Sequence, residues 1–591
     1  MQTDVVVPSP AAPPREPGVP GTATGRVVGR GARAVLRYAP LLVVGAILAY
    51  LVLAPLAVLL WSSFKPGGVI DSAGLTLANY LEVYSRPRIY RMLGNTIVFA
   101  VGSTVFAVVV GAALAWLFER TDLPSRRFLR SFIVVPLAMP PVLLGVAWVL
   151  LLDPTIGVIN SGLGLLSIGP LDIYSMWGMI FLEGVAFVPT TYLMLAPAFR
   201  NIDSSLEEAA LTSGAGTWML LRRVLIPLVT PSLLAVSSFL FIASFLLFDI
   251  PGLIGLRGGI HVLASEIYVA SQPQAGFPEY GEIGALAGIP LIMLLMLTWA
   301  YHFFVRRSYR YVVVSGKARH RRLFRLGRWR TPCVIVVWVY FLCAIIGPTL
   351  ALAAVSFFPY YTGISRDALA GLTFANYGEL LSSPTMLSGA WHTLVVAVVT
   401  ATFLMFFAPL VSWVVTKTRL RGRGVVDALA FMPIGIPAVM IGVALIFLYL
   451  QLPSVPIYAT IWIIAIAHIT TFTSFATRTT NGAVMQIAPE LEEAARTSGA
   501  TRAAAFRRVI LPLVRPAMLI VFVWVAAHSI RELSSALLLQ GTDNETVPTV
   551  LWGYWENGEP TVTAAGGVLL IAVLAVLVFA WSRVRKEDGE Y

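Results

Sequence analysis

The sequence predicts an all-α polytopic membrane protein with about 12 transmembrane helices, arranged as two tandem six-helix units. The 591 residues are 58% apolar and 12% charged, and their mean hydropathy is +0.81. That charge fraction is about half of what a soluble domain carries. The apolar residues gather in uncharged runs of about 20 residues, the length at which a helix crosses the bilayer core. Landmarks of the first half also return in the same order in the second half.

The apolar runs are continuous rather than alternating, which favours helices over the strands of a membrane barrel. In lipid a helix satisfies its own backbone hydrogen bonds. The runs lie at roughly 39–62, 92–118, 131–152, 174–199, 229–250, 284–305, 333–357, 389–416, 428–450, 459–477, 516–540 and 563–582.

Charge divides the chain into four segments. Residues 1–38 are rich in Pro, Gly and Ala with five arginines, which predicts a disordered tail. Residues 307–332 form a basic linker between a first unit, 39–306, and a second unit, 333–586. The stretch 306–330 holds nine arginines and Lys317 but no acid. Short basic loops stay in the cytoplasm, so we expect the linker and both termini on the cytoplasmic side of the membrane. Because the linker lies between membrane spans, we expect it to contact lipid headgroups and no nucleic acid.

A polar cassette occurs in both units, in the loops 200–228 and 483–513. Each copy reads Leu-Glu-Glu-Ala-Ala-x-Thr-Ser-Gly-Ala, and Glu208 and Glu493 are 285 residues apart. Helix-forming residues lead to a glycine suited to positive φ, which predicts a short helix, a turn and a second helix. The first helix is expected to start at serine caps in one copy and at Pro489 in the other, and Thr217 and Thr501 to cap the second helix. The plainer interpretation is an amphipathic hairpin at the membrane surface with no partner.

Further landmarks extend the repeat over both units. Residues 75–80 read Leu-Thr-Leu-Ala-Asn-Tyr, and residues 372–377 read Leu-Thr-Phe-Ala-Asn-Tyr. Pro136, Pro140 and Gly145 return as Pro433, Pro437 and Gly442, and we expect kinks and close packing at these residues of the third and ninth runs. Units with an even number of spans share one orientation, so a two-fold axis along the membrane normal is expected, with a path between the halves. Such a pair presents two equivalent faces to a symmetric partner.

These residues resemble the permeases of bacterial ABC importers that work with a solute-binding protein, over about residues 39–586. In that family the cassette is the EAA motif, and its short helix is a coupling helix seated in a groove of the ATPase. Val224 and Val509 stand where isoleucine is usual, and Ile226 where leucine is usual. The resemblance implies the type I permease fold, a place in the bacterial inner membrane, two copies of an ATPase subunit and an extracytoplasmic binding protein. It assigns ATPase coupling to Glu207, Glu208, Ala209, Gly214, Glu492, Glu493, Ala494 and Gly499.

The chain shows no sign of its own catalytic site. Gly316-Lys317 is followed by Ala318, so the sequence of a phosphate-binding loop is absent. Cys333 and Cys343 are ten residues apart in one predicted helix, too far to bridge. The six histidines form no ligand-spaced cluster. We therefore expect no enzyme activity, no metal and no cofactor, with ATP hydrolysis in a separate subunit.

Several ionisable residues lie inside predicted spans, where a charge is costly and usually faces the protein interior. They are Glu183, Asp249, His468, His528, Arg531 and Glu532. Two interpretations stay open: they line a translocation path, or they form hydrogen bonds between helices.

Fusion of two units in one chain resembles permeases for ferric iron, thiamine and aminoethylphosphonate. The segments 249–255, 265–268 and 552–558 look most like the ferric-iron type. Polyamine transport remains a further alternative. A 12-helix secondary transporter has the same parallel arrangement, but it leaves the two cassettes unexplained.

Overall fold

A computed structural model describes residues 38–587, except 71, 203–211, 215, 273–279, 291, 294–295, 297–322, 362 and 364–369. The tail 1–38 therefore lies almost entirely outside the described residues. So do most of the sixth apolar run and most of the basic linker, and Glu207, Glu208 and Ala209 as well. The described residues are helical apart from loops and one isolated β-bridge between Thr121 and Phe324. The all-α prediction is confirmed.

The helices of the first unit are η1 (Ala49–Leu53), α2 (Ala54–Ser63), η2 (Pro66–Gly68), α3 (Ala78–Ser85), α4 (Pro87–Arg120), α5 (Arg126–Phe132), η3 (Val135–Ala138), α6 (Pro141–Leu152), α7 (Val158–Leu165), α8 (Met176–Arg200), α10 (Thr217–Leu220), η4 (Leu221–Leu225), α11 (Ile226–Leu246), η5 (Pro251–Gly255), α12 (Leu263–Ser271) and α13 (Tyr280–Leu286).

Those that follow are η7 (Gly327–Trp329), α15 (Arg330–Phe341), η8 (Leu342–Ile346), α16 (Gly347–Val355), α18 (Ala375–Ser382), α19 (Pro384–Lys417), α20 (Arg423–Phe431), η9 (Met432–Gly435), α21 (Ala438–Leu450), α22 (Ile461–Gln486), α23 (Pro489–Thr497), α24 (Arg502–Ala505), η10 (Phe506–Ile510), α25 (Leu511–Leu513), α26 (Arg515–Ile530), α27 (Ser534–Leu539), α28 (Val547–Glu556) and α29 (Pro560–Glu587).

Seven of the described helical segments are long and apolar enough to cross a bilayer, and three bent pairs raise the number to ten. The expected tenth run, 459–477, lies within the 26-residue helix α22, which is not among these segments. Seven Thr and Ser side chains in Ile461–Gln486 make this helix more polar than the others.

Two expected spans are broken. The third bends by 90° between Ala138 and Pro141, and the ninth by 112° between Gly435 and Ala438. A further bend, of 71° at Val514, lies just before the eleventh run. Each break lies beside a proline, which lacks an N–H group and whose ring obstructs the preceding turn. The sequence predicted kinks in the third and ninth runs; the structure shows complete breaks there.

Four π-helical turns, η1, η4, η8 and η10, also come just before prolines: Pro55, Pro227, Pro348 and Pro512. Proline has no N–H group to donate to the preceding turn, and its ring crowds the carbonyl there. The wider π-helical turn makes room for the ring.

The repeat is visible as the same hydrogen bonds made twice. Asn79 Nδ2 donates to the carbonyl oxygen of Ser63, and Asn376 Nδ2 to that of Ser356, both at 2.8 Å. Thr96 Oγ1 accepts from the Leu263 N–H, and Thr393 Oγ1 accepts from the Val547 N–H, both at 2.9 Å. Two six-helix units of common design explain this pattern.

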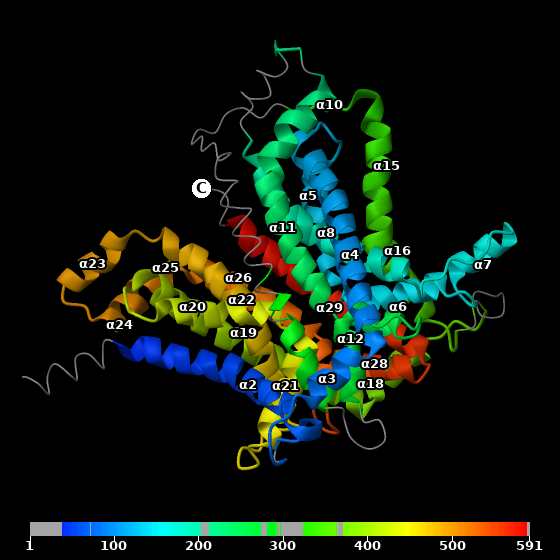
Figure 1. Ribbon diagram of the computed structural model, residues 1–591. Helices are drawn as coiled ribbons and strands as arrows, with labels where there is room; N and C mark the ends of the chain where they lie inside the picture. The colour runs from blue at the N-terminus through cyan, green and yellow to red at the C-terminus, as the bar shows by residue number, and fades with distance from the viewer. Residues whose placement is uncertain are drawn as a thin grey trace, which may run out of the picture.

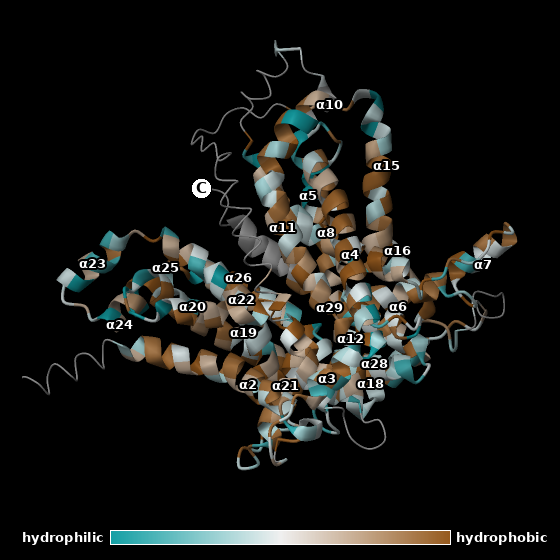
Figure 2. Ribbon diagram, viewed as in Figure 1, coloured by the Kyte–Doolittle hydropathy of each residue, from teal (hydrophilic) through white to brown (hydrophobic). Residues whose placement is uncertain are grey.

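Figure 1 shows two arms that diverge from a shared base. The first arm contains α4, α5, α8, α10, α11 and α15, and the second contains α2, α19, α20 and α22–α26. The cassettes lie at the tips, with α10 on one arm and α23 and α24 on the other. The long helices of both arms carry mainly hydrophobic residues (Figure 2).

The first helix of each unit packs on the other unit. The hydroxyls of Tyr50 and Tyr449 are 2.5 Å apart, and Thr470 Oγ1 donates to the Leu51 carbonyl oxygen at 3.3 Å. In the opposite direction, Trp148 Nε1 donates to the Cys343 carbonyl oxygen at 3.1 Å. Each arm is therefore built from residues of both units, which ties the two halves together at the base.

Candidate functional site

The second cassette forms the expected helix, turn and helix. Pro489 occupies the first turn of α23, and Gly499 has φ +89°. The Gly499 N–H donates to the Arg496 carbonyl oxygen and the Ala500 N–H donates to that of Ala495, which closes the helix end. Thr501 Oγ1 accepts from the Ala504 N–H at 3.2 Å and caps α24. The predicted turn and cap are confirmed in this copy.

The first cassette is described only in part. Gly214 has φ +83°, close to the value at Gly499, so the left-handed glycine is confirmed in both copies. The second helix of the cassette, α10, begins at Thr217 as expected, and the side chain of Thr217 lies outside the description. In both copies a π-helical turn follows, at 221–225 and 506–510.

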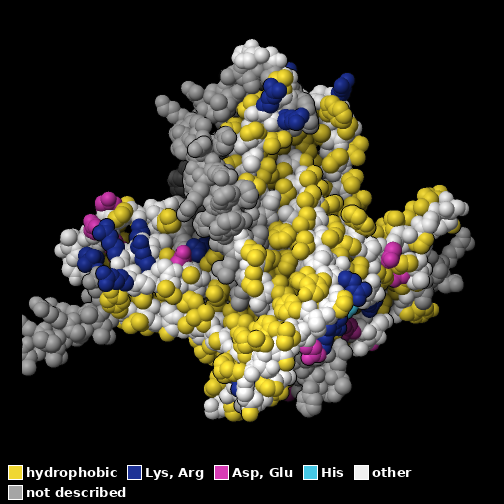
Figure 3. Space-filling view, viewed as in Figure 1, with side chains coloured by type: hydrophobic (Ala, Val, Ile, Leu, Met, Phe, Trp, Pro, Cys, Tyr) yellow, Lys and Arg dark blue, Asp and Glu magenta, His cyan; other side chains and the backbone are white. Residues whose placement is uncertain are grey.

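The helix α23 is exposed, and none of its residues is buried. Below it lies a groove of about 640 Å³, with a polar wall that includes Glu492, Glu493 and Arg496. Basic side chains from α19, the loop after it, α20 and α24 complete that wall: Lys417, Arg419, Arg423 and Arg502. Figure 3 shows Lys and Arg side chains gathered at the tip of this second arm, and others at the tip of the first arm. Apolar side chains cover the length of the first arm. Nothing in the described packing needs α23 to project in this way.

A central cavity of about 230 Å³ lies where the arms meet. Broken helices from both units form its walls: the η3–α6 break, the first turn of α21, and the chain just after α11 and α26. Five of the six predicted path residues line it, namely Glu183, Asp249, His528, Arg531 and Glu532. The sixth, His468, is hydrogen-bonded to Glu532.

The two units meet at equivalent positions in this cavity. Ser534 Oγ donates to Asp249 Oδ1 at 2.7 Å, and the two residues are 285 positions apart, the separation of the two cassettes. Arg531, at the end of α26, donates through Nη1 to the Leu137 carbonyl oxygen of the first unit at 2.8 Å. That carbonyl lies in η3, directly before the break at Met139 and Pro140.

Glu532 lies beyond the end of α26 and caps α27, so the expected continuous span through residues 531 and 532 is wrong. Its carboxylate accepts from the Ser535 N–H and hydroxyl at 2.9 and 2.8 Å. His468 Nε2 lies 3.0 Å from Glu532 Oε2, and His468 Nδ1 lies 2.7 Å from Ser529 Oγ. Both ring nitrogens of His468 and both oxygens of Glu532 therefore have partners.

Glu183 is the equivalent of His468 in the first unit, and its environment is different. Its side chain is 1% exposed and lines the cavity. Neither carboxyl oxygen has a hydrogen-bond partner among the described residues. A buried polar group without a partner is uncommon in folded proteins and calls for an explanation.

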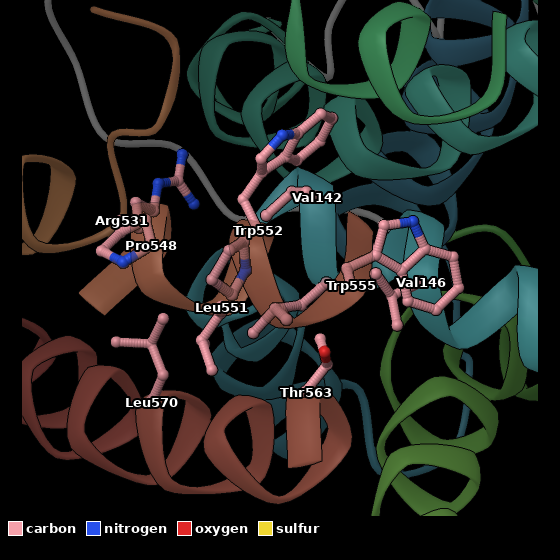
Figure 4. A pocket seen from close by; sticks show the side chains of 11 residues that line it. Val142, Val146, Arg531, Pro548, Leu551, Trp552, Trp555, Thr563 and Leu570 are labelled. Atoms are coloured by element: carbon pink, nitrogen blue, oxygen red, sulfur yellow. The ribbon is translucent and has the colours of Figure 1, made fainter. Parts of the chain in front are cut away.

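An aromatic cluster lies next to the cavity. Trp552 and Trp555 of α28 lie beside Val142 and Val146 of α6, as Figure 4 shows, around a void of about 10 Å³. Arg531 lines both this void and the central cavity. On the side of α26, His528 stacks on Trp524 with ring centroids 3.6 Å apart.

Sequence reasoning missed Ser534 and the Leu137 carbonyl, and it noted the two tryptophans only as part of the segment 552–558. Ser534 could have been found from its displacement relative to Asp249, and the Leu137 carbonyl from the prolines at 136 and 140. No group of three His, Cys, Asp or Glu side chains in the described part of the chain is close enough to hold a metal ion. Cys333 and Cys343 are both free thiols.

Comparison with known proteins bears on this arrangement. The profile of the family described as "Binding-protein-dependent transport system inner membrane component" matches residues 107–313 and 410–584, more than half of the chain. The ferric transport system permease protein FbpB of Actinobacillus pleuropneumoniae is 24% identical over 84% of this chain and 72% of its own. The probable ABC transporter permease protein y4fN of Sinorhizobium fredii is 25% identical over 90% of this chain and 92% of its own.

Among solved structures, a bacterial alginate ABC transporter in complex with an alginate pentasaccharide-bound periplasmic protein is similar to part of the chain. It has a TM-score of 0.38 and 17% identity, and it covers 45% of this chain and 97% of that one.

Proposed function

Because the chain belongs to the family of binding-protein-dependent transport system inner membrane components, we propose that it forms the translocation path of a ferric-iron importer. It is a multi-pass permease of an ABC importer and is not itself catalytic, since ATP is hydrolysed in a separate subunit. This membership rules out the secondary-transporter alternative.

The observation that carries the proposal is the arrangement of the arms. Two like cassettes lie at two separate tips, and the arms meet at one polar cavity between the units. We propose that each tip docks one ATPase subunit through Glu207, Glu208, Ala209 and Gly214 or through Glu492, Glu493, Ala494 and Gly499. Both tips then face the cytoplasm, as do the termini. Closure of the ATPase pair would draw the tips together as rigid bodies and change access to the cavity.

The cavity is the proposed path, entered from an extracytoplasmic binding protein docked at the base. Its polar wall is made by Glu183, Asp249, His528, Arg531 and Glu532, with His468 behind Glu532. The tryptophans at 552 and 555 line a small void next to this cavity, and Arg531 lines both.

Ferric iron is the proposed solute because FbpB-type permeases are similar to this chain over most of its length. Thiamine, polyamines and aminoethylphosphonate are the alternatives, and the binding protein decides among them.

The test is transport by the complete importer. The permease, its ATPase and its binding protein are reconstituted in vesicles, and radioactive ferric iron is supplied to the binding protein. We expect uptake that needs ATP and all three components. Uptake without the ATPase would contradict the importer mechanism, and ATP-driven uptake of another solute but not iron would contradict the proposed substrate.

A further inference from the structure

The central cavity contains more acid than base. The acids that line it are Glu183, Asp249 and Glu532, and the arginine is Arg531. His528 also lines the cavity, and the carboxyl groups outnumber the arginine three to one.

Most of these groups already have partners within the protein. Asp249 accepts from Ser534, Glu532 accepts from Ser535 and His468, and Arg531 donates to the Leu137 carbonyl oxygen. Glu183 is the exception, although it is the most deeply buried of the three acids. An isolated carboxylate at membrane depth costs free energy, and a cation in the cavity would offset that cost.

The pseudo-symmetry sharpens this observation. At the equivalent position His468 has a hydrogen-bond partner at both nitrogens. If the position served only to join helices, Glu183 would be expected to have partners too. Instead neither of its carboxyl oxygens has a partner among the residues that the structure describes, and its side chain lines a cavity whose volume, about 230 Å³, admits a small hydrated or chelated ion.

We propose that Glu183, supported by Asp249 and Glu532, forms a cation-binding subsite in the central cavity. The described acids are not arranged to ligate a bare metal, so the cation keeps its own shell of water or small ligands and is held by charge and hydrogen bonds. This deepens the proposed function, on which it rests, because it assumes that the cavity is the path. It favours solutes that carry positive charge in the cavity over sulfate-like or phosphonate anions.

Binding to the permease alone tests the subsite. The probe is hexaamminecobalt(III), a trivalent ion whose ammine shell does not exchange, added to permease in nanodiscs of zwitterionic lipid and followed by calorimetry. We expect Glu183→Gln to weaken binding at least tenfold and Glu183→Asp to change it less than threefold. The matched control is Glu379→Gln, the same change at an exposed position of α18, which should bind like the unmodified chain.

A second measurement needs no variant. A hydrophobic carbodiimide labels buried carboxyls, and mass spectrometry of the unmodified permease reports the labelling of Glu183. Hexaamminecobalt(III) should slow this labelling, whereas sodium sulfate at equal ionic strength should not. Unchanged labelling in the presence of the probe, equal binding by Glu183→Gln, or protection by sulfate would each overturn the proposal.

These outcomes are separate from the failure of the importer proposal. Protection of Glu183 without ATP-driven uptake would keep the subsite and reject the transport role. ATP-driven uptake without any protection would keep the transport role and reject the subsite.

Discussion

The two units make the same hydrogen bonds at the base but differ in the positions of their charged side chains. At the base, Asn79 and Asn376 bind equivalent carbonyls, and Thr96 and Thr393 accept from equivalent N–H groups. Between the base and the cassettes, the side chains that join the helices differ. Near the end of α4, Glu119 is fully buried and pairs with Arg130 and Arg200 at 2.9 and 3.1 Å.

The second unit replaces this ionic cluster with hydroxyl groups. The residue before the last in α4 is Glu119, and in α19 it is Thr416. There α19 is joined to α22 by Ser412 and Thr480, whose hydroxyls are 2.6 Å apart. The base shows the same contrast in its charges. There Glu266 and Glu282 of the first unit form ion pairs with Arg86, Arg88 and His261.

The lesson of this comparison is that the fold needs the shared base and tolerates different ways of joining the helices above it. Within the cavity the difference has a chemical consequence, because Glu183 and His468 occupy equivalent places with opposite charge preference. The predictions below test which differences matter, from the largest expected effect to the smallest.

The largest effect is expected where the units are most alike. Replacing both Gly214 and Gly499 with Val places a β-branched residue at φ +83° and +89°, a conformation such residues rarely adopt. None of the described atoms lies within 4 Å of the position that a Cβ would take at either glycine, so backbone strain rather than a clash is the cause. We expect ATP-driven uptake to fall to background in reconstituted vesicles, with the protein still inserted.

The two single variants sharpen this comparison. Gly214→Val and Gly499→Val should lower uptake to similar extents if the two cassettes dock equivalent ATPase subunits. Normal uptake by the double variant would contradict the docking role. A strong defect from one single variant only would show that the tips are not equivalent.

Much of the fold follows from local sequence. Apolar runs gave the long helices, and Gly499, Pro489 and Thr501 gave the cassette turn, because helix ends depend on the residues at the ends themselves. The exchange of first helices between units was not predicted. It depends on which apolar faces fit together, and Tyr50 and Tyr449 meet although they are 399 positions apart.

The cavity was predicted in part. Ionisable residues inside apolar runs pointed to five of its lining residues, because burial of charge needs a reason. The helix breaks that line the cavity were predicted only as kinks. The hydrogen bond from Arg531 to the Leu137 carbonyl oxygen, beside one of these breaks, was therefore not predicted. Glu119 was missed for another reason: an acid near the end of a helix looks like an ordinary exposed charge until α5 and α8 bring two arginines to it.

The second prediction concerns that ionic cluster. Glu119→Gln leaves Arg130 and Arg200 without a counter-charge while Tyr192 keeps a possible partner. Loss of one partner of a buried pair costs several kcal/mol, but both arginines are partly exposed, so we expect about 2 kcal/mol. Thermal unfolding of the purified permease in detergent measures the loss.

The second unit supplies the comparison for this variant. Ser412→Ala removes one neutral hydrogen bond to Thr480 and should cost about 1 kcal/mol. Glu379→Gln, at an exposed site, controls for the chemical change. Equal unfolding temperatures for Glu119→Gln and Glu379→Gln would show that the ionic cluster adds nothing to stability.

The third prediction concerns the ion pairs that the first unit forms at the base. Glu282 is almost fully buried and lies 2.7 and 2.8 Å from the guanidinium groups of Arg86 and Arg88, which are one-third to one-half exposed. Glu282→Gln should cost about 1 kcal/mol at low salt and less at high salt, because exposed partners are screened. Unfolding temperatures at two salt concentrations test this, and a difference independent of salt would contradict an ionic role.

The smallest effect is expected at Asp153, beyond the end of α6. Burial raises the pKa of its carboxyl, but hydrogen bonds from the Thr155 hydroxyl and N–H, the Ile156 N–H and the Tyr174 hydroxyl outweigh it and hold the pKa below its usual value. A lowered pKa in the folded state stabilises the protein above the pKa of the unfolded chain. That contribution is lost as the pH falls through the folded value.

Asp153→Asn should therefore lower stability at pH 7 by about 1 kcal/mol, and the difference from the unmodified chain should shrink below about pH 4. Chemical denaturation at pH 7 and at about pH 3 measures both. At the corresponding end of α21 the second unit carries Leu450 and Gln451, so Gln451→Ala provides a matched variant whose effect should not change with pH. A difference at Asp153 that stays constant across this pH range would show that the carboxylate charge has no part in holding the loop.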